Sequence, residues 1–185
     1  MNQAWSYASN LSDKPLLGLT IGDMFDQTVE RYPDNEALIS RHQGLRYTYR
    51  QLQHEVDRCA RALMALGVQK GERVGIWAPN CAEWAITQFA TAKIGAILVN
   101  INPSYRVHEV QYALKQSGTK ALILAPSFRS SNYVEMMRQV LPDLKRGKSG
   151  EVKSERLPDL RLVITIGEEE HSGFLSWKRL FETAS

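Results

Sequence analysis

The sequence has 185 residues, of which 43% are hydrophobic and 23% are charged, a composition typical of folded globular domains and not of disordered chains. A chain of this length can bury roughly 70% of its unfolded surface, which is enough for a proper core. The 23 basic and 20 acidic residues leave a formal net charge of +3, which is too small and too scattered to indicate a nucleic-acid-binding domain.

The first elements that the sequence predicts are a helix, a β-hairpin and a second helix. Thr20 can cap the first helix, and Pro33 ends it. A turn near Gly44 separates two short extended segments. Thr48 and Gln51 form a capping box in front of the second helix, because the hydroxyl can accept from an orphan amide while the Gln side chain reaches back. We expect helices over residues 21–32 and 49–66 and strands over residues 37–40 and 45–47.

From residue 73 the sequence alternates between apolar strands and helices. Asn80 is expected to cap the first of these helices, with Glu83 three residues on. Gly95 and Gly118 end two of the helices. The alternation predicts an α/β fold in which a parallel-sheet layer has flanking helices and right-handed crossovers. We expect strands over residues 73–78, 96–101, 120–124 and 160–166, and helices over residues 81–94, 107–117, 132–141 and 176–183.

One segment interrupts this alternation. Residues 145–156 are polar and basic and include Gly147 and Gly150, a pattern that predicts a mobile surface loop. Such a loop could contact a phosphate or a nucleic acid, but a solvated loop is the favoured interpretation. The organisation predicted for residues 1–185 is a leader (1–19), a helix–hairpin–helix followed by βαβ units (20–143), a mobile basic loop (144–157), and a further strand and helix (158–185).

Cysteine content and hydropathy bear on the cell compartment. No metal-ligand spacing links Cys59 to Cys81, and a secreted disulfide framework would need more cysteines. Residues 1–19 lack the basic start and apolar run of a signal peptide. No stretch approaches the ~20 apolar residues of a membrane span. We therefore expect a cytoplasmic protein with reduced thiols and no transmembrane segment.

The sequence contains no self-contained catalytic motif. It has neither a glycine-rich phosphate loop nor a Gly-x-Ser-x-Gly nucleophile turn. The pairs His54-Glu55 and His108-Glu109 begin like a zinc-binding helix, but neither has a second histidine four residues after the first. Cys81 is predicted at a helix N-terminus, where the pKa of a thiol can fall, yet a bystander thiol is the favoured interpretation. We expect no catalytic residue and no metal site in this chain.

The loops after two predicted strands form the candidate site. In open parallel sheets, ligands bind beyond the carboxyl ends of the strands. One of these loops carries Asn80 and Cys81, and the other carries Asn102 and Pro103. We interpret the four residues as part of the wall of a substrate crevice. The alternative, that the prolines only end strands and that Asn80 only caps a helix, remains open.

Five segments, in order and at suitable spacings, resemble motifs of the adenylate-forming enzymes. The first contains the aromatic–Thr/Ser–Tyr–x–x–Leu signature of the first core motif, and the fourth ends in the Asn-x-Asn-Pro form seen in acyl-CoA synthetases. The resemblance covers roughly residues 20–167. The five segments are residues 45–52 (LRYTYRQL), 71–76 (GERVGI), 78–84 (APNCAEW), 92–103 (AKIGAILVNINP) and 157–160 (LPDL).

This resemblance implies the N-terminal subdomain of the adenylate-forming synthetase fold, within the large AMP-binding domain. It also implies a parent enzyme that activates a carboxylic acid, here a fatty acid, with ATP and Mg²⁺ to an acyl-adenylate. The acyl group then passes to the thiol of coenzyme A. The family's phosphate-binding loop, adenine pocket and C-terminal lysine follow the motifs matched here, and none of them occurs in this sequence. We therefore expect a fragment of an acid–thiol ligase that lacks the remainder of the enzyme, is inactive alone and binds no cofactor.

Two other classes of protein stay open. One is a free-standing α/β binding or interaction module that kept this half of an enzyme's fold. The other is a basic nucleic-acid-binding domain, which is the least favoured, so we expect no nucleic-acid partner. An apolar surface that the rest of an enzyme would cover also favours self-association into a homo-oligomer.

Overall fold

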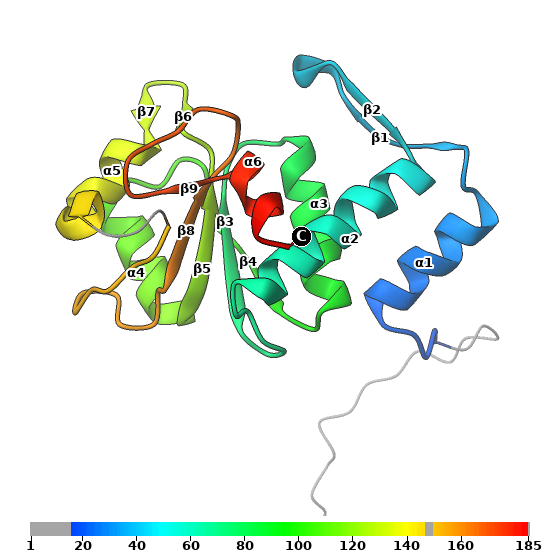
Figure 1. The fold of residues 1–185 in the computed structure, drawn as a ribbon, viewed down its shortest axis with the longest axis horizontal. Helices are drawn as coiled ribbons and strands as arrows, with labels where there is room; N and C mark the ends of the chain where they lie inside the picture. The colour runs from blue at the N-terminus through cyan, green and yellow to red at the C-terminus, as the bar shows by residue number, and fades with distance from the viewer. Residues whose placement is uncertain (1–15, 147–149, 185) are drawn as a thin grey trace, which may run out of the picture.

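The computed structural model describes residues 16–146 and 150–184 as an α/β fold built around a five-stranded parallel sheet. In chain order its elements are α1 (Ile21–Arg31), β1 (Glu36–Ser40), η1 (Arg41–Gln43), β2 (Leu45–Thr48), α2 (Tyr49–Ala65), β3 (Arg73–Trp77), α3 (Ala82–Lys93), β4 (Ile97–Asn100), α4 (Val107–Ser117), β5 (Thr119–Leu124), β6 (Ser127–Phe128), β7 (Ser131–Asn132), α5 (Tyr133–Val140), η2 (Pro142–Arg146), β8 (Leu162–Thr165), β9 (Leu175–Ser176), α6 (Trp177–Leu180) and η3 (Phe181–Ala184). The sheet order is β4-β3-β5-β8-β9. Helices α2, α3 and α6 lie on one side of the sheet and α4 and α5 on the other (Figure 1), so the predicted fold class is confirmed.

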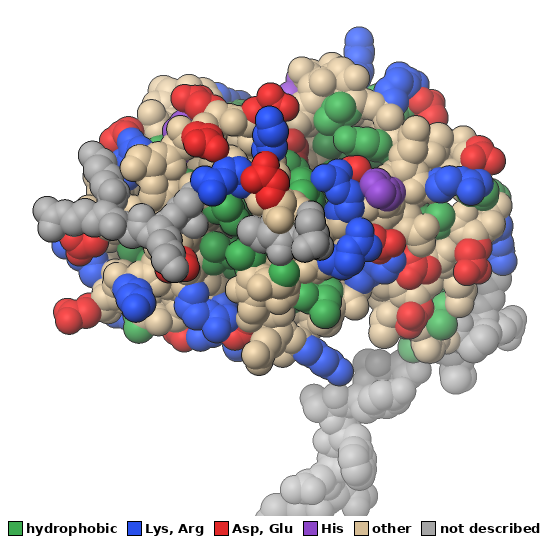
Figure 2. Space-filling model, in the orientation of Figure 1, with side chains coloured by type: hydrophobic (Ala, Val, Ile, Leu, Met, Phe, Trp, Pro, Cys, Tyr) green, Lys and Arg blue, Asp and Glu red, His purple; other side chains and the backbone are tan. Residues whose placement is uncertain are grey.

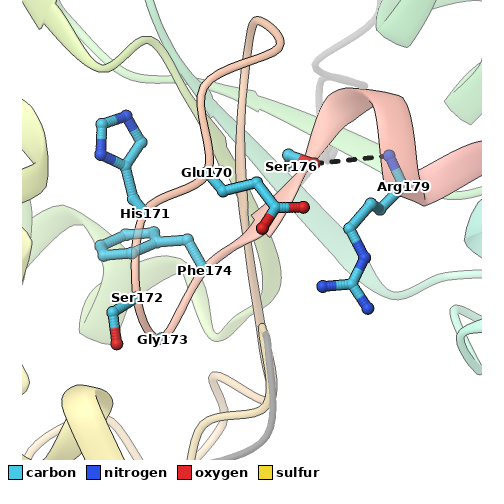
Figure 3. Close-up of a pocket in the computed structure, with 7 residues that line it drawn as sticks. All are labelled: Glu170, His171, Ser172, Gly173, Phe174, Ser176 and Arg179. Atoms are coloured by element: carbon cyan, nitrogen blue, oxygen red, sulfur yellow. Dashed lines mark hydrogen bonds between the residues drawn. The ribbon is translucent and has the colours of Figure 1, made fainter.

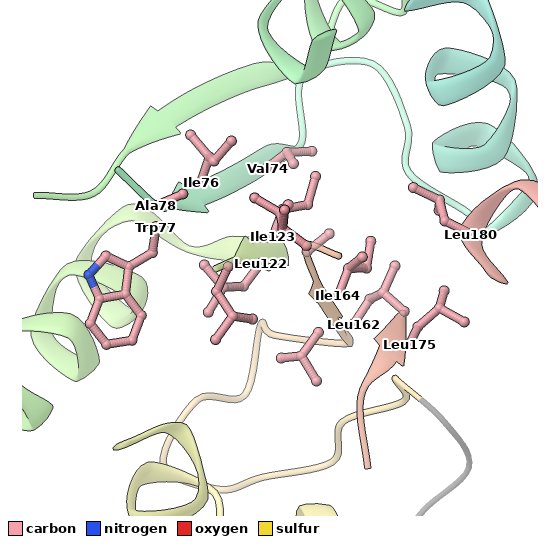
Figure 4. Packing of buried hydrophobic residues seen from close by; sticks show 14 of the residues in the cluster. Val74, Ile76, Trp77, Ala78, Leu122, Ile123, Leu162, Ile164, Leu175 and Leu180 are labelled. Carbon is pink, nitrogen blue, oxygen red and sulfur yellow. The ribbon is translucent and has the colours of Figure 1, made fainter. Parts of the chain in front are cut away.

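The middle strands of the sheet are buried on both faces. Val74 and Ile76 in β3, Leu122 in β5 and Ile164 in β8 are 0% exposed (Figure 4). Because helices cover both faces, these strands are nearly continuous apolar runs instead of alternating ones. Burying an aliphatic side chain of this size contributes about 1.5–3 kcal/mol, so this layer holds the fold together. At the sheet edge, by contrast, Ile97 of β4 is 50% exposed.

The N-terminal region contains the helix, hairpin and helix that the sequence predicts. At α1 the Thr20 hydroxyl accepts from the backbone N–H of Asp23 at 3.1 Å. At α2 the Thr48 hydroxyl accepts from the N–H of Gln51, and the Gln51 side chain accepts from the N–H of Thr48 at 2.9 Å. Both helices therefore begin at a capping box, which supplies partners for backbone amides that the first turn leaves unpaired.

Several short elements differ from the predictions. Strand β9 adds a fifth member to a sheet for which four strands were expected, and β6 pairs with β7 in a small hairpin. The segment expected as a last helix divides into α6 and η3. Two-residue strands carry no measurable periodicity, so the hydrophobic pattern could not reveal them.

Part of the segment predicted as a mobile basic loop is instead hydrogen-bonded to the sheet. The N–H of Val152 donates to the carbonyl of Arg161, and the N–H of Val163 donates to the carbonyl of Gly150, each at 2.8 Å. Val152 is also buried. This segment therefore lies along β8, although residues 147–149 of the predicted loop lie outside the described residues.

A cluster of three charges, Asp26, Asp57 and Lys93, ties α1, α2 and α3 together. The Lys93 ammonium donates to the Asp26 carboxylate at 2.7 Å and to the Asp57 carboxylate at 2.6 Å. Burial alone would raise the pKa of Asp26, but the hydrogen bonds from Lys93 and Gln53 outweigh it and leave this pKa below its usual value. Burial would likewise lower the pKa of Lys93, and its two carboxylate partners raise it instead.

We predict that Lys93→Met lowers the free energy of unfolding by about 1–2 kcal/mol at pH 7, between the values for exposed and buried ion pairs, because it leaves two carboxylates facing each other. Because the folded pKa of Asp26 is depressed, its contribution is present above the unfolded pKa near 3.8 and is lost as pH falls through the folded pKa. Urea unfolding should therefore show a smaller difference at pH 3. Lys115→Met, on an exposed part of α4, is the matched control and should change stability by less than about 0.5 kcal/mol.

Candidate functional site

The loops after β3 and β4 leave the sheet at the same edge. The two strands are parallel neighbours in register, so residues 78–81 and residues 101–103 begin side by side. The indole N–H of Trp77 joins them by donating to the backbone carbonyl of Asn102 at 3.1 Å. The structure thus brings the two loops that carry the predicted site residues to the edge where ligands bind in this architecture. Those residues are Asn80, Cys81, Asn102 and Pro103.

The helix cap predicted at Asn80 is wrong. The N-cap residue of α3 is Cys81, and its side chain makes no capping hydrogen bond. The side-chain oxygen of Gln43, in the hairpin turn, accepts instead from the N–H of Ala82 at 2.8 Å. Because this partner lies 39 residues earlier in the chain, no local pattern could have indicated it. Asn80 itself is exposed at the sheet edge.

Cys81 is not an activated thiol. Burial, followed by the nearby Glu83 carboxylate, raises the pKa of Cys81 to about 12. Burial also raises the pKa of Cys59, which is 0% exposed, to about 12. Desolvation therefore outweighs the effect of the helix N-terminus, and both thiols are protonated at neutral pH. This supports the bystander interpretation.

A buried aromatic pair holds the loop after β4 in place. The rings of Trp77 and Tyr133 stack with centroids 3.8 Å apart and planes 14° apart. The Tyr133 hydroxyl donates to the carbonyl of Pro103. The side chain of Asn102 accepts from the N–H of Ser104 at 2.8 Å, which closes a tight turn. Asn102 and Pro103 thus lie in a loop that is fixed from below and open to solvent at Asn102.

The strand order brings in a third loop that the sequence analysis missed. Numbered along the chain, the five strands run 2-1-3-4-5, an order in which ligands bind between the first and third strands. Here these are β3 and β5, whose following helices lie on opposite faces. The loop after β5, residues 125–132, therefore leaves the sheet at the same edge as residues 78–81. Sequence periodicity does not reveal strand order, although a polar loop directly after a buried strand was the available signal.

Two arginines lie on the loops at this edge. Arg129, in the turn between β6 and β7, has a φ of 52°, which is uncommon for a residue other than glycine. Its guanidinium lies 5.1 Å from the centre of the Phe128 ring. Arg106, in the loop after β4, donates to the Ser131 hydroxyl at 3.0 Å. Guanidinium groups in such positions suit phosphate and carboxylate ligands.

The loop after β8 encloses a small pocket of about 250 Å³ (Figure 3). Glu170 and Arg179 lie on one side of it, and the His171 ring meets Phe174 edge-on on the other, with centroids 6.4 Å apart. The backbone N–H of Arg179 donates to Ser176, which caps α6. The lining also includes Ser172 and Ser176. Ser176 caps α6, and the Nε2 atom of His171 has no hydrogen-bond partner among the described residues, so these side chains form no catalytic set.

The described residues contain no cluster of metal-ligating side chains. Within residues 16–146 and 150–184, no three His, Cys, Asp or Glu side chains come together to hold a metal ion. His54 and His108, the two histidines that begin zinc-like pairs, are both exposed on helices.

The chain forms a doubly wound parallel sheet with three loops at one edge, and its sequence matches a known enzyme family over most of its length. Residues 25–175 match the family of AMP-binding enzymes. The chain therefore belongs to the AMP-binding enzyme family.

Similar proteins within that family are acyl-CoA ligases. The chain is 40% identical over 161 residues to the mitochondrial medium-chain acyl-CoA ligase ACSF2 of Mus musculus, covering 87% of this chain and 26% of that protein. It is 43% identical over 162 residues to the putative acyl-CoA synthetase YngI of Bacillus subtilis, covering 88% of this chain and 30% of that protein. The chain thus spans less than a third of the length of these relatives.

Solved structures of related enzymes share the fold. An anthranilate CoA ligase, AuaEII, in complex with anthranoyl-AMP matches 92% of this chain and 29% of its own with a TM-score of 0.74 and 26% identity. A putative long-chain-fatty-acid CoA ligase from Rhodopseudomonas palustris matches 88% of this chain and 36% of its own with a TM-score of 0.71 and 25% identity.

Proposed function

We propose that this chain is the N-terminal part of an acyl-CoA synthetase. The enzyme activates a carboxylic acid with ATP to an acyl-adenylate and transfers the acyl group to coenzyme A. The observation that carries the proposal is the 40–43% identity to acyl-CoA ligases over 87–88% of the chain. ATP, coenzyme A and Mg²⁺ are the cofactors of the whole enzyme.

The substrate that we propose is a medium-chain fatty acid, because the ACSF2 relatives are medium-chain acyl-CoA ligases. The test is acyl-CoA formation by the full-length protein with saturated acids from four to sixteen carbons. We expect a maximum at intermediate chain length. A maximum at the long end would overturn the substrate class, and no product with any acid would overturn the proposed activity.

Within that enzyme, we propose that three loops of this chain form part of the wall of the substrate crevice. The wall consists of the loops after β3, β4 and β5, which contain Asn80, Cys81, Asn102 and Pro103. The guanidinium groups of Arg106 and Arg129 suit this role, because the acid, ATP and coenzyme A are all anionic.

We predict that Asn80→Asp in the full-length protein lowers acyl-CoA formation roughly fivefold and leaves the melting temperature unchanged. Asn80 is exposed and does not cap α3, so the fold should tolerate the change. A new negative charge about 4 Å from an anionic group of the substrate costs about 1 kcal/mol where water screens the two charges, which corresponds to a roughly fivefold effect. Asn35→Asp, in the exposed turn before β1, is the matched control. Full activity of Asn80→Asp would assign this loop a purely structural role.

The second candidate function is a free-standing α/β binding or interaction module. A parent reading frame that continues past Ser185 into a Ser/Thr/Gly-rich loop would exclude it. A nucleic-acid-binding role receives little support, because basic and acidic side chains are interspersed on the face in Figure 2. No helix among residues 16–146 and 150–184 is long and apolar enough to cross a membrane. Cytoplasmic localisation and self-association stay predictions.

A further inference from the structure

The side chain of Gln43 joins two segments that lie far apart in the sequence. Its oxygen accepts from the N–H of Ala82 at 2.8 Å, and its nitrogen donates to the Glu83 carboxylate at 2.8 Å. The hydroxyl of Ser40, which is only 7% exposed, donates to the same Gln43 oxygen at 2.6 Å. Two donors on the oxygen and one acceptor on the nitrogen fix the orientation of the amide.

These contacts supply what the N-terminus of α3 lacks. The first amides of a helix have no partners within it, and the N-cap side chain normally provides one. The Cys81 side chain does not, and Gln43 caps α3 from the hairpin. The turn between β1 and β2 lies close to the start of α3 (Figure 1). Because residues 78–81 connect β3 to this helix turn, a shift of the hairpin would move that loop.

We propose that Gln43 is a positioning residue, which holds residues 78–81 in the conformation that forms one wall of the substrate crevice. The proposal rests on the proposed function for its consequence in catalysis, but not for its structural part. Gln43 touches no substrate in this scheme. It acts through Ala82 and Glu83, and so couples the N-terminal hairpin to the sheet edge.

The structural part is tested by the reactivity of Cys81 in the full-length protein. Labelling by N-ethylmaleimide is followed at single cysteines by peptide mass spectrometry. In Gln43→Ala we expect Cys81 to be labelled roughly 2- to 30-fold faster, the range that loss of a helix cap allows, because the first turn of α3 opens. Cys59, which is fully buried, should keep its rate and exclude general unfolding. The matched control is Gln53→Ala, because Gln53 also donates to a carboxylate, that of Asp26, at 2.7 Å.

The catalytic part is tested by kinetics and by a swap of the two partners. Gln43→Ala should raise KM for the acid or for coenzyme A more than it lowers kcat, since the chemical groups stay in place. Gln43→Glu alone sets two carboxylates against each other and should be worse. Combining it with Glu83→Gln places a donor opposite an acceptor again and should return KM close to its wild-type value, which would assign the change in KM to the contact between residues 43 and 83.

Each result decides the proposal. Unchanged Cys81 labelling in Gln43→Ala, or equal acceleration in Gln53→Ala, overturns the positioning role. Faster labelling of Cys81 with an unchanged KM would mean that Gln43 only caps α3. It would overturn the proposal that Gln43 shapes the crevice wall. If Gln43→Ala does not fold, the failure of the swapped pair to recover KM overturns the proposal instead. An inactive but folded wild-type protein contradicts the proposed function alone, because the labelling result still stands.

Discussion

Residues 1–185 alone should give no ATP–pyrophosphate exchange with any fatty acid, whereas the full-length protein should give exchange with its preferred acid. Adenylation requires donors and a metal ion around the charge that develops on the α-phosphate. The sequence has no glycine-rich phosphate loop, and residues 16–146 and 150–184 contain no cluster of metal-ligating side chains. Enzymes typically accelerate reactions at least ~10⁶-fold. Without the groups that stabilise this charge, the exchange rate should therefore fall to that of the blank.

The measurement is incorporation of labelled pyrophosphate into ATP at saturating acid, with the two proteins at equal concentration. A sample without protein and one with heat-treated full-length protein define the blank. Circular dichroism of residues 1–185 shows whether they are folded, so that a negative result can be assigned to missing groups. Exchange clearly above the blank from these residues would place an adenylation site within them. It would contradict the interpretation that they are an inactive fragment of a longer ligase.

The fold was predictable where its determinants are local. Thr20 and Thr48 each precede a residue that completes a capping box, and the structure starts helices at both. Gly118 stands in the left-handed conformation that ends α4, as expected for a glycine after a helical pattern. Long apolar strands such as β5 follow from composition, because a strand buried on both faces needs apolar residues throughout.

The missed features depend on contacts between distant segments. Gln43 caps α3 from another element, so Asn80 was assigned a role that local sequence favours but tertiary structure gives to a different residue. Strand β9 exists because its two residues, Leu175 and Ser176, pair with the end of β8. The place between β3 and β5 where ligands are expected can be located only when the strand order is known. That order puts the loop after β5, with Arg129, beside the loop after β3.

The candidate site shows the same division. That Asn102 and Cys81 lie in neighbouring loops followed from two parallel strands in succession. What holds those loops did not follow, because the stack of Trp77 on Tyr133 joins the end of β3 to the start of α5, across more than fifty residues. The family resemblance supplied the activity of the relatives, and the residues themselves supplied only the scaffold.

Trp77→Ala in the full-length protein is expected to lower the free energy of unfolding by roughly 3–5 kcal/mol, the usual cost of truncating a buried tryptophan. The Trp77 side chain is 0% exposed, and its ring stacks on Tyr133 with centroids 3.8 Å apart. Its removal leaves a cavity, an unpaired ring and a carbonyl at Asn102 without its donor. Urea unfolding followed by circular dichroism measures the loss, which should appear as a lower midpoint.

Two graded variants separate packing from hydrogen bonding at this position. Trp77→Phe keeps a ring to stack but loses the N–H that donates to Asn102, and it should cost less than Trp77→Ala. Tyr133→Phe keeps the stack and removes only the hydroxyl that donates to Pro103, so it should cost about 1–2 kcal/mol. If the stack braces the crevice, both variants should also lower acyl-CoA formation under conditions where the protein stays folded, because Asn102 and Pro103 lose an anchor. A loss below about 1 kcal/mol for Trp77→Ala would show that the loop after β4 is held by other contacts, and the aromatic pair would then have no role in shaping the site.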